Sequence, residues 1–247
     1  MLRRRFLQPY WTRVHGVALA GMNFGNDDQA TNGELWLLDR LATNLTSPVI
    51  FDVGANVGRY SEAVLERIAG ARLYAFEPSA TAFPKLQAGL GQRARTFRYA
   101  LGAENSEEPL YADRPGSEMG SLIRRDLHRH GLAVAEQETV VVRRLDSLCD
   151  ELDVERIDLL KIDAEGAELD VLRGAGDMLG SRIGIIEFEF VGTAIDAHHA
   201  LRDFVDLLEP AYCIHRLLPG ALWPLDYTER SEIFEYANYI ALQKSDR

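Results

Sequence analysis

Short, mostly apolar runs alternate along this chain with segments whose apolar side chains recur every three or four positions. The runs cover residues 49–53, 72–78, 95–101, 157–166 and 182–190, and their length and composition predict buried strands. Between them the helical spacing of residues such as Val64, Leu65 and Ile68 predicts helices. Strands that alternate with helices in this way indicate an α/β protein with a mostly parallel sheet.

The flanking regions add four more elements. Helices are expected over residues 33–42, before the first strand, and over 201–208, which ends before Pro210. Further strands are expected near 212–218 and 236–242.

One stretch breaks the alternation. Residues 111–138 are polar, contain three glycines and should leave the sheet. This composition is typical of functional loops, so we expect a lid-like insertion that covers a binding site. No repeat or linker divides the rest, which predicts one domain over 33–247 after an N-terminal extension over 1–32 that can form a short helix.

The charge of the chain narrows the choice of partners. Acidic residues outnumber basic ones by 38 to 27, a net charge of −11, which disfavours nucleic acid and anionic membranes as main partners. Cys149 and Cys213 are far apart and in no metal-ligand pattern, so both should be reduced. The basic start lacks the uninterrupted apolar stretch of an export signal, and no run is long enough to span a bilayer. We therefore expect a cytoplasmic protein, and the sequence leaves an oligomer open.

The first chemical motif is PVIFDVGANVGRY, at residues 48–60. A strand ends near Asp52, turns through Gly54 and Gly58, and enters a helix, so that backbone N–H groups can approach a ligand closely. The spacing differs from the G-x-G-x-x-G fingerprint of dinucleotide-binding turns. A carboxylate before the turn would repel a pyrophosphate but can face the ammonium or sulfonium of S-adenosylmethionine. We therefore predict S-adenosylmethionine as the ligand.

A second acid supports this prediction. Glu77 ends the second strand 25 residues after Asp52, close to the interval at which an acid binds ribose hydroxyls in nucleotide-binding α/β folds. A carboxylate can accept hydrogen bonds from both hydroxyls of a ribose. Taken alone, Glu77 could equally be an exposed residue at a strand end.

From about NGELWLLDRLA to its end, the chain resembles the FkbM-type S-adenosylmethionine-dependent O-methyltransferases. The resemblance is carried by VIFDVGANVGRYS, AFEPSATAFPKL, YALGAENSEEPLY, IGIIEFEF, YANYIAL and, most specifically, KIDAEGAELDVLRGA. It implies a Rossmann-like class I methyltransferase fold, with a seven-stranded, mostly parallel sheet and helices on both faces. It also implies methyl transfer to a hydroxyl of a sugar, glycan or secondary metabolite. The predicted cofactor-binding residues are Asp52, Gly54, Asn56, Gly58, Tyr60, Glu77, Pro78, Ser79 and Ala100.

Carboxylates gather at the ends of two later strands. KIDAEGAE supplies Asp163, Glu165 and Glu168, and IIEFEF supplies Glu187 and Glu189 on one face of its strand. We predict Asp163, Glu165 and Glu189 as catalytic, because a hydroxyl must lose its proton when it attacks a methyl group. They could act as base, orient the acceptor or hold a divalent metal, whose spacing here is not diagnostic. Acids in the first turn of a helix are also stabilised by its dipole without any catalytic role.

For the other polar residues near these elements, the sequence leaves a functional and a purely structural role open. His198 and His199 could serve as general bases or form a solvated helix start. The insertion contains Arg114, Arg124, Arg125, His128, Arg129 and His130, which could bind an anionic group of the acceptor or form a solvated face.

Two other functions compete with methyl transfer. A nicotinamide-dependent oxidoreductase or epimerase is disfavoured by Asp52 and by the glycine spacing. A cofactor-binding module without catalysis is disfavoured by the carboxylates at the strand ends. The identity of the acceptor lies in the irregular segments, and the sequence does not supply it.

Overall fold

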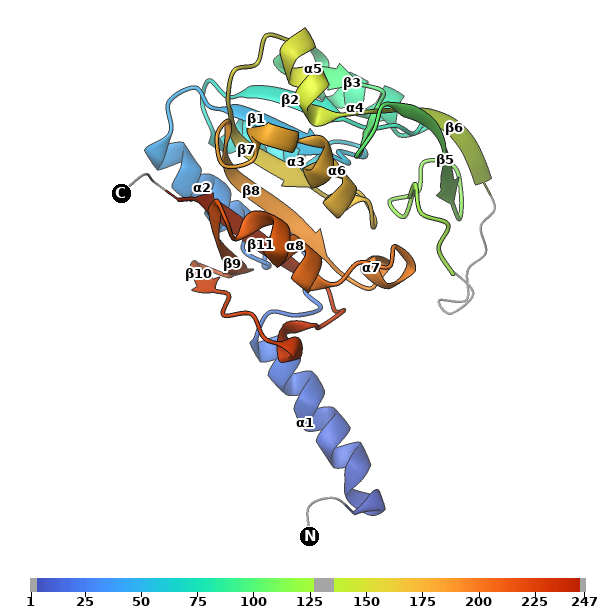
Figure 1. Cartoon of the computed structure of the whole chain (residues 1–247), viewed down its shortest axis with the longest axis vertical. Helices are drawn as coiled ribbons and strands as arrows, with labels where there is room; N and C mark the ends of the chain where they lie inside the picture. Colours follow the sequence, from blue (N-terminus) through green and yellow to red (C-terminus); the bar gives the residue numbers. More distant parts are fainter. Residues whose placement is uncertain (1–3, 127–135, 245–247) are drawn as a thin grey trace.

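The computed structural model describes residues 4–126 and 136–244 (Figure 1). The helices are α1 (Gln8–Gly21), α2 (Glu34–Asn44), α3 (Arg59–Arg67), α4 (Phe83–Leu90), α5 (Leu145–Glu151), α6 (Glu168–Gly174), α7 (Thr193–Asp196) and α8 (Leu201–Leu208). The strands are β1 (Val49–Val53), β2 (Arg72–Phe76), β3 (Arg95–Phe97), β4 (Ala100–Leu101), β5 (Ser106–Ala112), β6 (Glu136–Arg143), β7 (Ile157–Ile162), β8 (Ile183–Phe190), β9 (Tyr212–Leu218), β10 (Ala221–Pro224) and β11 (Ala237–Gln243).

The main sheet has the strand order β10-β9-β11-β8-β7-β1-β2-β3. The strands from β8 to β3 pair in parallel, and β11 is antiparallel to both of its neighbours, β8 and β9. The sheet therefore has the α/β, mainly parallel architecture expected from the sequence. It has eight strands rather than seven, because β10 turns back at Gly220 and pairs with β9. The sequence missed β10 because its residues are partly or fully exposed and carry no buried apolar run.

A smaller sheet, β4-β6-β5, corrects two further expectations. Residues 95–101 do not form one strand: β3 is the last strand of the main sheet, and Ala100 and Leu101 pair with β6 instead. Both ends of the 111–138 segment belong to the antiparallel β5–β6 pair, as in the partners Tyr111 and Gln137. Residues 113–126 form the loop between them, and 127–135 lie outside the described residues.

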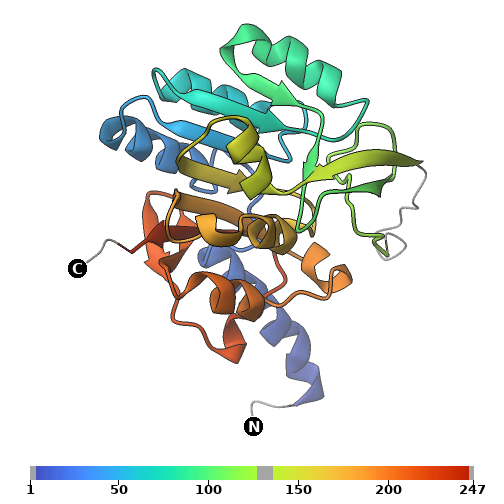
Figure 2. The same ribbon diagram turned by 45° about the horizontal axis from the view of Figure 1, so that its top comes forward.

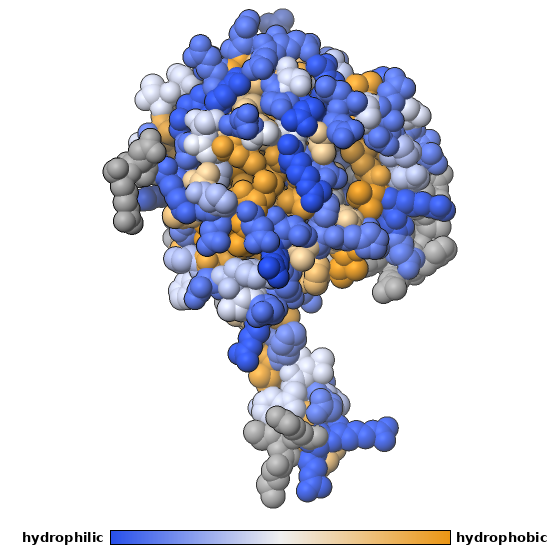
Figure 3. Space-filling model, viewed as in Figure 1, coloured by the Kyte–Doolittle hydropathy of each residue, from blue (hydrophilic) through white to orange (hydrophobic). Residues whose placement is uncertain are grey.

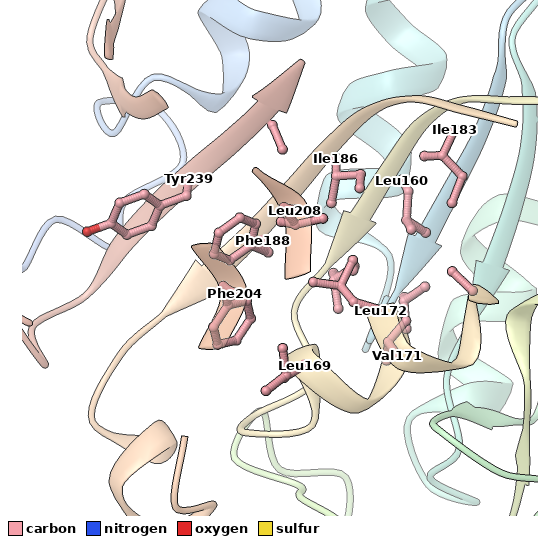
Figure 4. Close-up of a cluster of buried hydrophobic side chains, with 14 of the residues drawn as sticks. Leu160, Leu169, Val171, Leu172, Ile183, Ile186, Phe188, Phe204, Leu208 and Tyr239 are labelled. Atoms are coloured by element: carbon pink, nitrogen blue, oxygen red, sulfur yellow. The ribbon is translucent and has the colours of Figure 1, made fainter. Parts of the chain in front are cut away.

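Alternating side chains divide the sheet into two faces. On one face the apolar residues of β7 and β8 pack against α6 and α8, and Phe188 stacks on Phe204 with ring centroids 4.8 Å apart (Figure 4). On the other face Ile50 and Leu159 pack against α2 and α3. Burial of these apolar side chains supplies the main stabilisation of the fold, at about 25 cal/mol per Å². The second face also carries the polar residues of the site described below.

Helix α1 projects from the body as a separate stalk (Figures 1 and 2). Leu19 is its only buried residue, and Val17 is 74% exposed. Phe6, just before the helix, is 76% exposed. On the face of the molecule in Figure 3, hydrophilic residues cover most of the body and hydrophobic ones gather near its middle. Among the described helices, none is both long and apolar enough to cross a membrane.

Candidate active site

A cavity of about 540 Å³ opens beyond the carboxyl ends of β1, β2, β7 and β8. Ligands of open α/β sheets bind at such strand ends. Of the residues predicted from the sequence, all but Gly58 line this cavity, so the structure brings the two predicted groups into one space. Gly58 instead directly precedes α3, with φ +96°, and a Cβ there would lie 3.0 Å from the side chain of Leu86 in α4.

The turn after β1 lies directly against the end of β7. The N–H groups of Gly54 and Ala55 both donate to the Phe76 carbonyl, each at 3.0 Å. Gly54 has φ +82°, and a Cβ there would lie 1.7 Å from the carbonyl oxygen of Asp163. Only glycine allows this approach, which places the predicted donor turn beside the predicted catalytic carboxylate.

Asp52 lies at the base of the cavity and is 2% exposed. Its Oδ2 accepts a hydrogen bond from the Ser61 hydroxyl at 2.6 Å, which joins β1 to α3. Burial raises the pKa of Asp52 to about 6 despite this bond. A desolvated carboxyl group of this kind would be stabilised as an anion by a cationic ligand.

Glu77 follows β2 and lines the cavity at the same end as Asp52. Its two carboxylate oxygens accept the backbone N–H groups of Asn56 at 2.9 Å and Ser79 at 2.8 Å. Burial raises the pKa of Glu77 to about 7, against the lowering effect of these two bonds. Pro78, Ser79 and Ala100 line the cavity beside it.

These residues fit S-adenosylmethionine. A carboxylate has about four acceptor positions, so Glu77 retains two for ribose hydroxyls after binding two N–H groups. The Oδ1 atom of Asn56 is buried, and no hydrogen-bond partner is found for it in the described part of the chain. It can therefore accept a hydrogen bond from a ligand. The volume is in the range of sites that bind small molecules.

The second end of the cavity contains the three predicted catalytic acids. Asp163 follows β7, and its side chain is 39% exposed on the cavity wall. Glu189, on the neighbouring strand β8, is 6% exposed and hydrogen-bonds to Asp163. Burial, followed by the charge of Asp163, raises the pKa of Glu189 well above its usual value. Glu189 therefore binds a proton more readily than an ordinary glutamate, and it does so beside Asp163.

Glu165 is less available than the sequence suggested. Its Oε2 accepts from Arg125 Nη1 at 2.7 Å in a partly buried ion pair, with side chains 23% and 11% exposed. Burial nevertheless raises the pKa of Glu165 to about 8. The Ser121 hydroxyl also donates to the Glu165 backbone carbonyl at 2.6 Å. Glu165 thus joins the loop between β5 and β6 to the turn after β7.

Sequence reasoning overlooked Lys161, Glu34 and Tyr236, which also line the cavity. Lys161 lies in β7 and is 2% exposed, and its Nζ is 3.3 Å from Asp163 Oδ2 and 4.0 Å from Glu34 Oε1. A lysine inside a buried apolar strand was a signal in the sequence, because a buried charge needs a partner. Glu34 and Tyr236 carried no comparable signal, since both join the site from distant segments.

Other candidates lie outside this arrangement. Glu168 accepts the N–H groups of Ala164 and Gly166 at 2.9–3.0 Å, so it holds the turn after β7. His198 and His199 are not among the residues that line the cavity.

The basic residues of the insertion do not form one cluster in the described part of the chain. Arg114 is exposed and pairs with Asp113 at 3.6 Å, and Arg124 is also exposed. His128, Arg129 and His130 lie outside the described residues. Within residues 4–126 and 136–244, no group of three or more His, Cys, Asp or Glu side chains could hold a metal ion.

A family model described as the methyltransferase FkbM domain matches residues 52–212. The 2-O-methyltransferase NoeI of Sinorhizobium fredii is 30% identical over 173 residues, which cover 65% of this chain and 71% of that protein. The AMB antimetabolite synthetase AmbE of Pseudomonas aeruginosa is 35% identical over 176 residues, which cover 57% of this chain and only 8% of the synthetase.

Among solved structures, a methyltransferase FkbM from Methylobacillus flagellatus is similar with a TM-score of 0.48 and 16% identity. The match covers 78% of this chain and 43% of that one.

Proposed function

The chain belongs to the FkbM methyltransferase family, and we propose that it moves a methyl group from S-adenosylmethionine to a hydroxyl of a sugar, glycan or secondary-metabolite acceptor. The observation that carries this proposal is the single cavity that joins Glu77 and Asp52 at one end to Asp163 and Glu189 at the other. When bound, the donor supplies an electrophilic methyl group on a positively charged sulfur.

In this proposal each end of the cavity has its own task. Glu77 binds the ribose hydroxyls, and Asp52 faces the cationic part of the donor. Asp163 accepts the hydroxyl proton of the acceptor. Glu189 and Glu165, which is paired with Arg125, orient the acceptor molecule. Holding the acceptor oxygen in line with the methyl carbon and sulfur can contribute several kcal/mol, and a positioned base about 10²–10⁴-fold in rate.

The lining of the cavity favours an acceptor without negative charge. Of the described residues that line the whole cavity, nine are acidic and only two, Lys161 and Arg59, are basic. Carboxyl groups bind hydroxyl donors well and repel phosphates and carboxylates. Transfer to a hydroxyl also agrees with the name of the relative from Sinorhizobium fredii, a 2-O-methyltransferase.

We also propose that the protein acts in the cytoplasm. Cys149 and Cys213 are both free thiols, as is usual for proteins in that reducing compartment.

Incubation with methyl-labelled S-adenosylmethionine and a panel of acceptors tests the proposal. The panel pairs neutral sugars and polyhydroxylated metabolites with phosphorylated or carboxylated forms of the same compounds. Label should enter a neutral acceptor as a base-stable methyl ether, with much less in its anionic counterpart. Calorimetry that shows tight binding of NAD and none of S-adenosylmethionine would contradict the proposal.

A further inference from the structure

Beside Asp163 lies a lysine that is almost completely buried. Asp163 is on the cavity wall, with its side chain 39% exposed, whereas the side chain of Lys161 is 3% exposed. The Lys161 Nζ lies 3.3 Å from Asp163 Oδ2 and 5.4 Å from the centre of the Tyr60 ring. Both residues line the cavity, but Asp163 presents far more surface to an acceptor, while the Lys161 ammonium lies against the carboxyl groups beside it.

Lys161 faces acidic groups from several elements. They are Asp52 from β1, Glu34 from α2, Asp163 after β7, Glu187 from β8 and Tyr236 before β11, with the Tyr60 ring of α3 beside them. Asp163 in turn lies beside Glu165, Glu168 and Glu189. The other described cation at this end, Arg125, is bonded to Glu165. Lys161 is thus the cation that Asp163 contacts, and its nearest oxygen belongs to Asp163 rather than to Glu34.

The acids in this group fall into two classes. Burial raises the pKa of Glu187 to about 8 and that of Glu189 well above its usual value. Burial acts on Asp163 in the same sense, yet the charge of Lys161 and the hydrogen bond from Glu189 outweigh it and lower its pKa. Coulombic attraction at 3.3 Å in a buried setting is strong enough to make this difference.

We propose that Lys161 is a positioning residue that fixes the proton of the Asp163–Glu189 pair on Glu189 and so leaves Asp163 as the base. This inference rests on the proposed methyl transfer. In that step the acceptor oxygen forms its bond to the methyl carbon while its proton passes to the Asp163 carboxylate. The sulfur–carbon bond breaks, its electron pair stays on the sulfur, and the proton later leaves Asp163 for solvent.

Carboxyl-labelled NMR of the full chain tests the proton placement without any acceptor. The protein is labelled with ¹³C at its Asp and Glu carboxyl groups, and Asp163→Asn and Glu189→Gln assign the two signals. At neutral pH the Asp163 signal should be that of a carboxylate and the Glu189 signal that of an acid. The reverse assignment in the unmodified protein would overturn the inference, whatever any variant does.

Variants at Lys161 and at Glu34 distinguish an electrostatic role of the lysine from a role in packing. Lys161→Met should raise the titration midpoint of Asp163 by about one pH unit or more, the scale of a lost opposite charge. Glu34→Gln removes an acid from the same cluster, so the titration midpoint of Asp163 should decrease or stay unchanged. Lys161→Arg keeps the charge and should behave as the unmodified protein. A role in packing alone predicts no such opposite shifts, so equal midpoints in the Met and Gln variants would overturn the inference.

Turnover then separates this inference from the proposed function. Once an acceptor has been identified, kcat/KM can be measured against pH. The acidic limb of this profile should move to higher pH in Lys161→Met, with little change in the Kd for S-adenosylmethionine. An unmodified enzyme that transfers methyl groups with Asp163 protonated would overturn the inference and leave the proposed function standing. A protein that methylates no hydroxyl while binding NAD would overturn both.

Discussion

Both carboxylate oxygens of Glu77 already accept a backbone N–H, from Asn56 and from Ser79, before any ligand is bound. One side chain therefore shapes the loops around the donor end of the cavity and still has acceptor positions for a ligand. At Gly54 a missing side chain has a comparable effect, because its hydrogen atom occupies the space beside the Asp163 carbonyl. The site depends on such single atoms, which are open to direct test.

Replacing Glu77 by Gln should weaken binding of S-adenosylmethionine by about 1.5–3 kcal/mol, since the amide removes the charge and presents N–H groups to other donors. The pKa of Glu77 is raised to about 7, so affinity in the unmodified protein should increase as pH rises through 7 and the carboxylate forms. This increase should be reduced in Glu77→Gln. Titration calorimetry at pH 6 and 8 measures both effects, and the exposed Glu107→Gln provides the matched control. Equal affinity in the two variants would argue against the ribose role.

The substitution Gly54→Ala should destabilise the fold by about 3 kcal/mol or more. The new Cβ would lie 1.7 Å from the Asp163 carbonyl oxygen, and φ is +82°. Gly16→Ala in the exposed helix α1 is the matched control, because no atom lies within 4 Å of the position that its new methyl group would take and alanine favours helix. Urea unfolding of both variants measures the difference. A Gly54→Ala protein as stable as the control would contradict this account of the turn.

The change Asp163→Asn should leave binding of S-adenosylmethionine nearly intact and reduce kcat by about 10²-fold or more. The amide keeps the volume and one acceptor oxygen but removes the charge. Single-turnover kinetics beside calorimetry measures the two separately. Addition of EDTA, followed by magnesium or manganese, distinguishes a direct base from a metal ligand. Normal turnover in Asp163→Asn would assign this acid to the stabilisation of the turn alone.

At the scale of elements, the loop after β5 contacts both ends of the cavity. Its Glu118 pairs with Arg59 at the start of α3 at 3.2 Å, and Arg125 pairs with Glu165 after β7 at 2.7 Å. The first pair is exposed and should be weak, while the second is partly buried. This arrangement supports our proposal that the loop covers the acceptor.

Hydrogen exchange in residues 113–126 should be fast in the free protein and slow with S-adenosylmethionine and acceptor bound, because ligand contacts suppress local opening. Peptides from α1 should exchange at the same rate in both states, since that helix projects away from the main sheet in both views of the fold (Figures 1 and 2) and none of its residues lines the cavity. Mass spectrometry of the two states gives the comparison. Slow exchange of 113–126 in the free protein would identify a rigid insert instead.

For the whole molecule, the buried acids make stability depend on pH. Burial raises the pKa values of Asp52 to about 6, Glu77 and Glu168 to about 7, and Glu165 and Glu187 to about 8, against values near 4 in an unfolded chain. The folded protein therefore binds more protons than the unfolded chain between these limits. Its free energy of unfolding should decrease as pH rises from 5 to 8, by about 2 kcal/mol or more.

Urea unfolding across this pH range tests that dependence. Glu187→Gln removes one fully buried acid and should flatten the decrease. An unfolding free energy that rises between pH 5 and 8 would mean that these carboxyl groups are charged and paired in the folded protein.

The order of strands and helices followed from the sequence, because apolar period and length are local properties of each segment. β10 and the division of residues 95–101 did not, since pairing partners decide them. The donor turn and Glu77 could be found from their spacing, while the site also required Glu34, which joins β7 from a separate helix.

By itself, the sequence determined that Asp163 and Glu189 end neighbouring strands and that a glycine turn follows β1. Only the tertiary structure decided how deeply each of these acids is buried and which charged groups from other segments lie around it. The proton distribution depends on distances between segments far apart in the chain, such as the 4.0 Å between Lys161 and Glu34, and on burial that differs from one acid to the next. A linear pattern specifies which groups are present, whereas their charge is set by the solvent and partners that the packed fold leaves around each one.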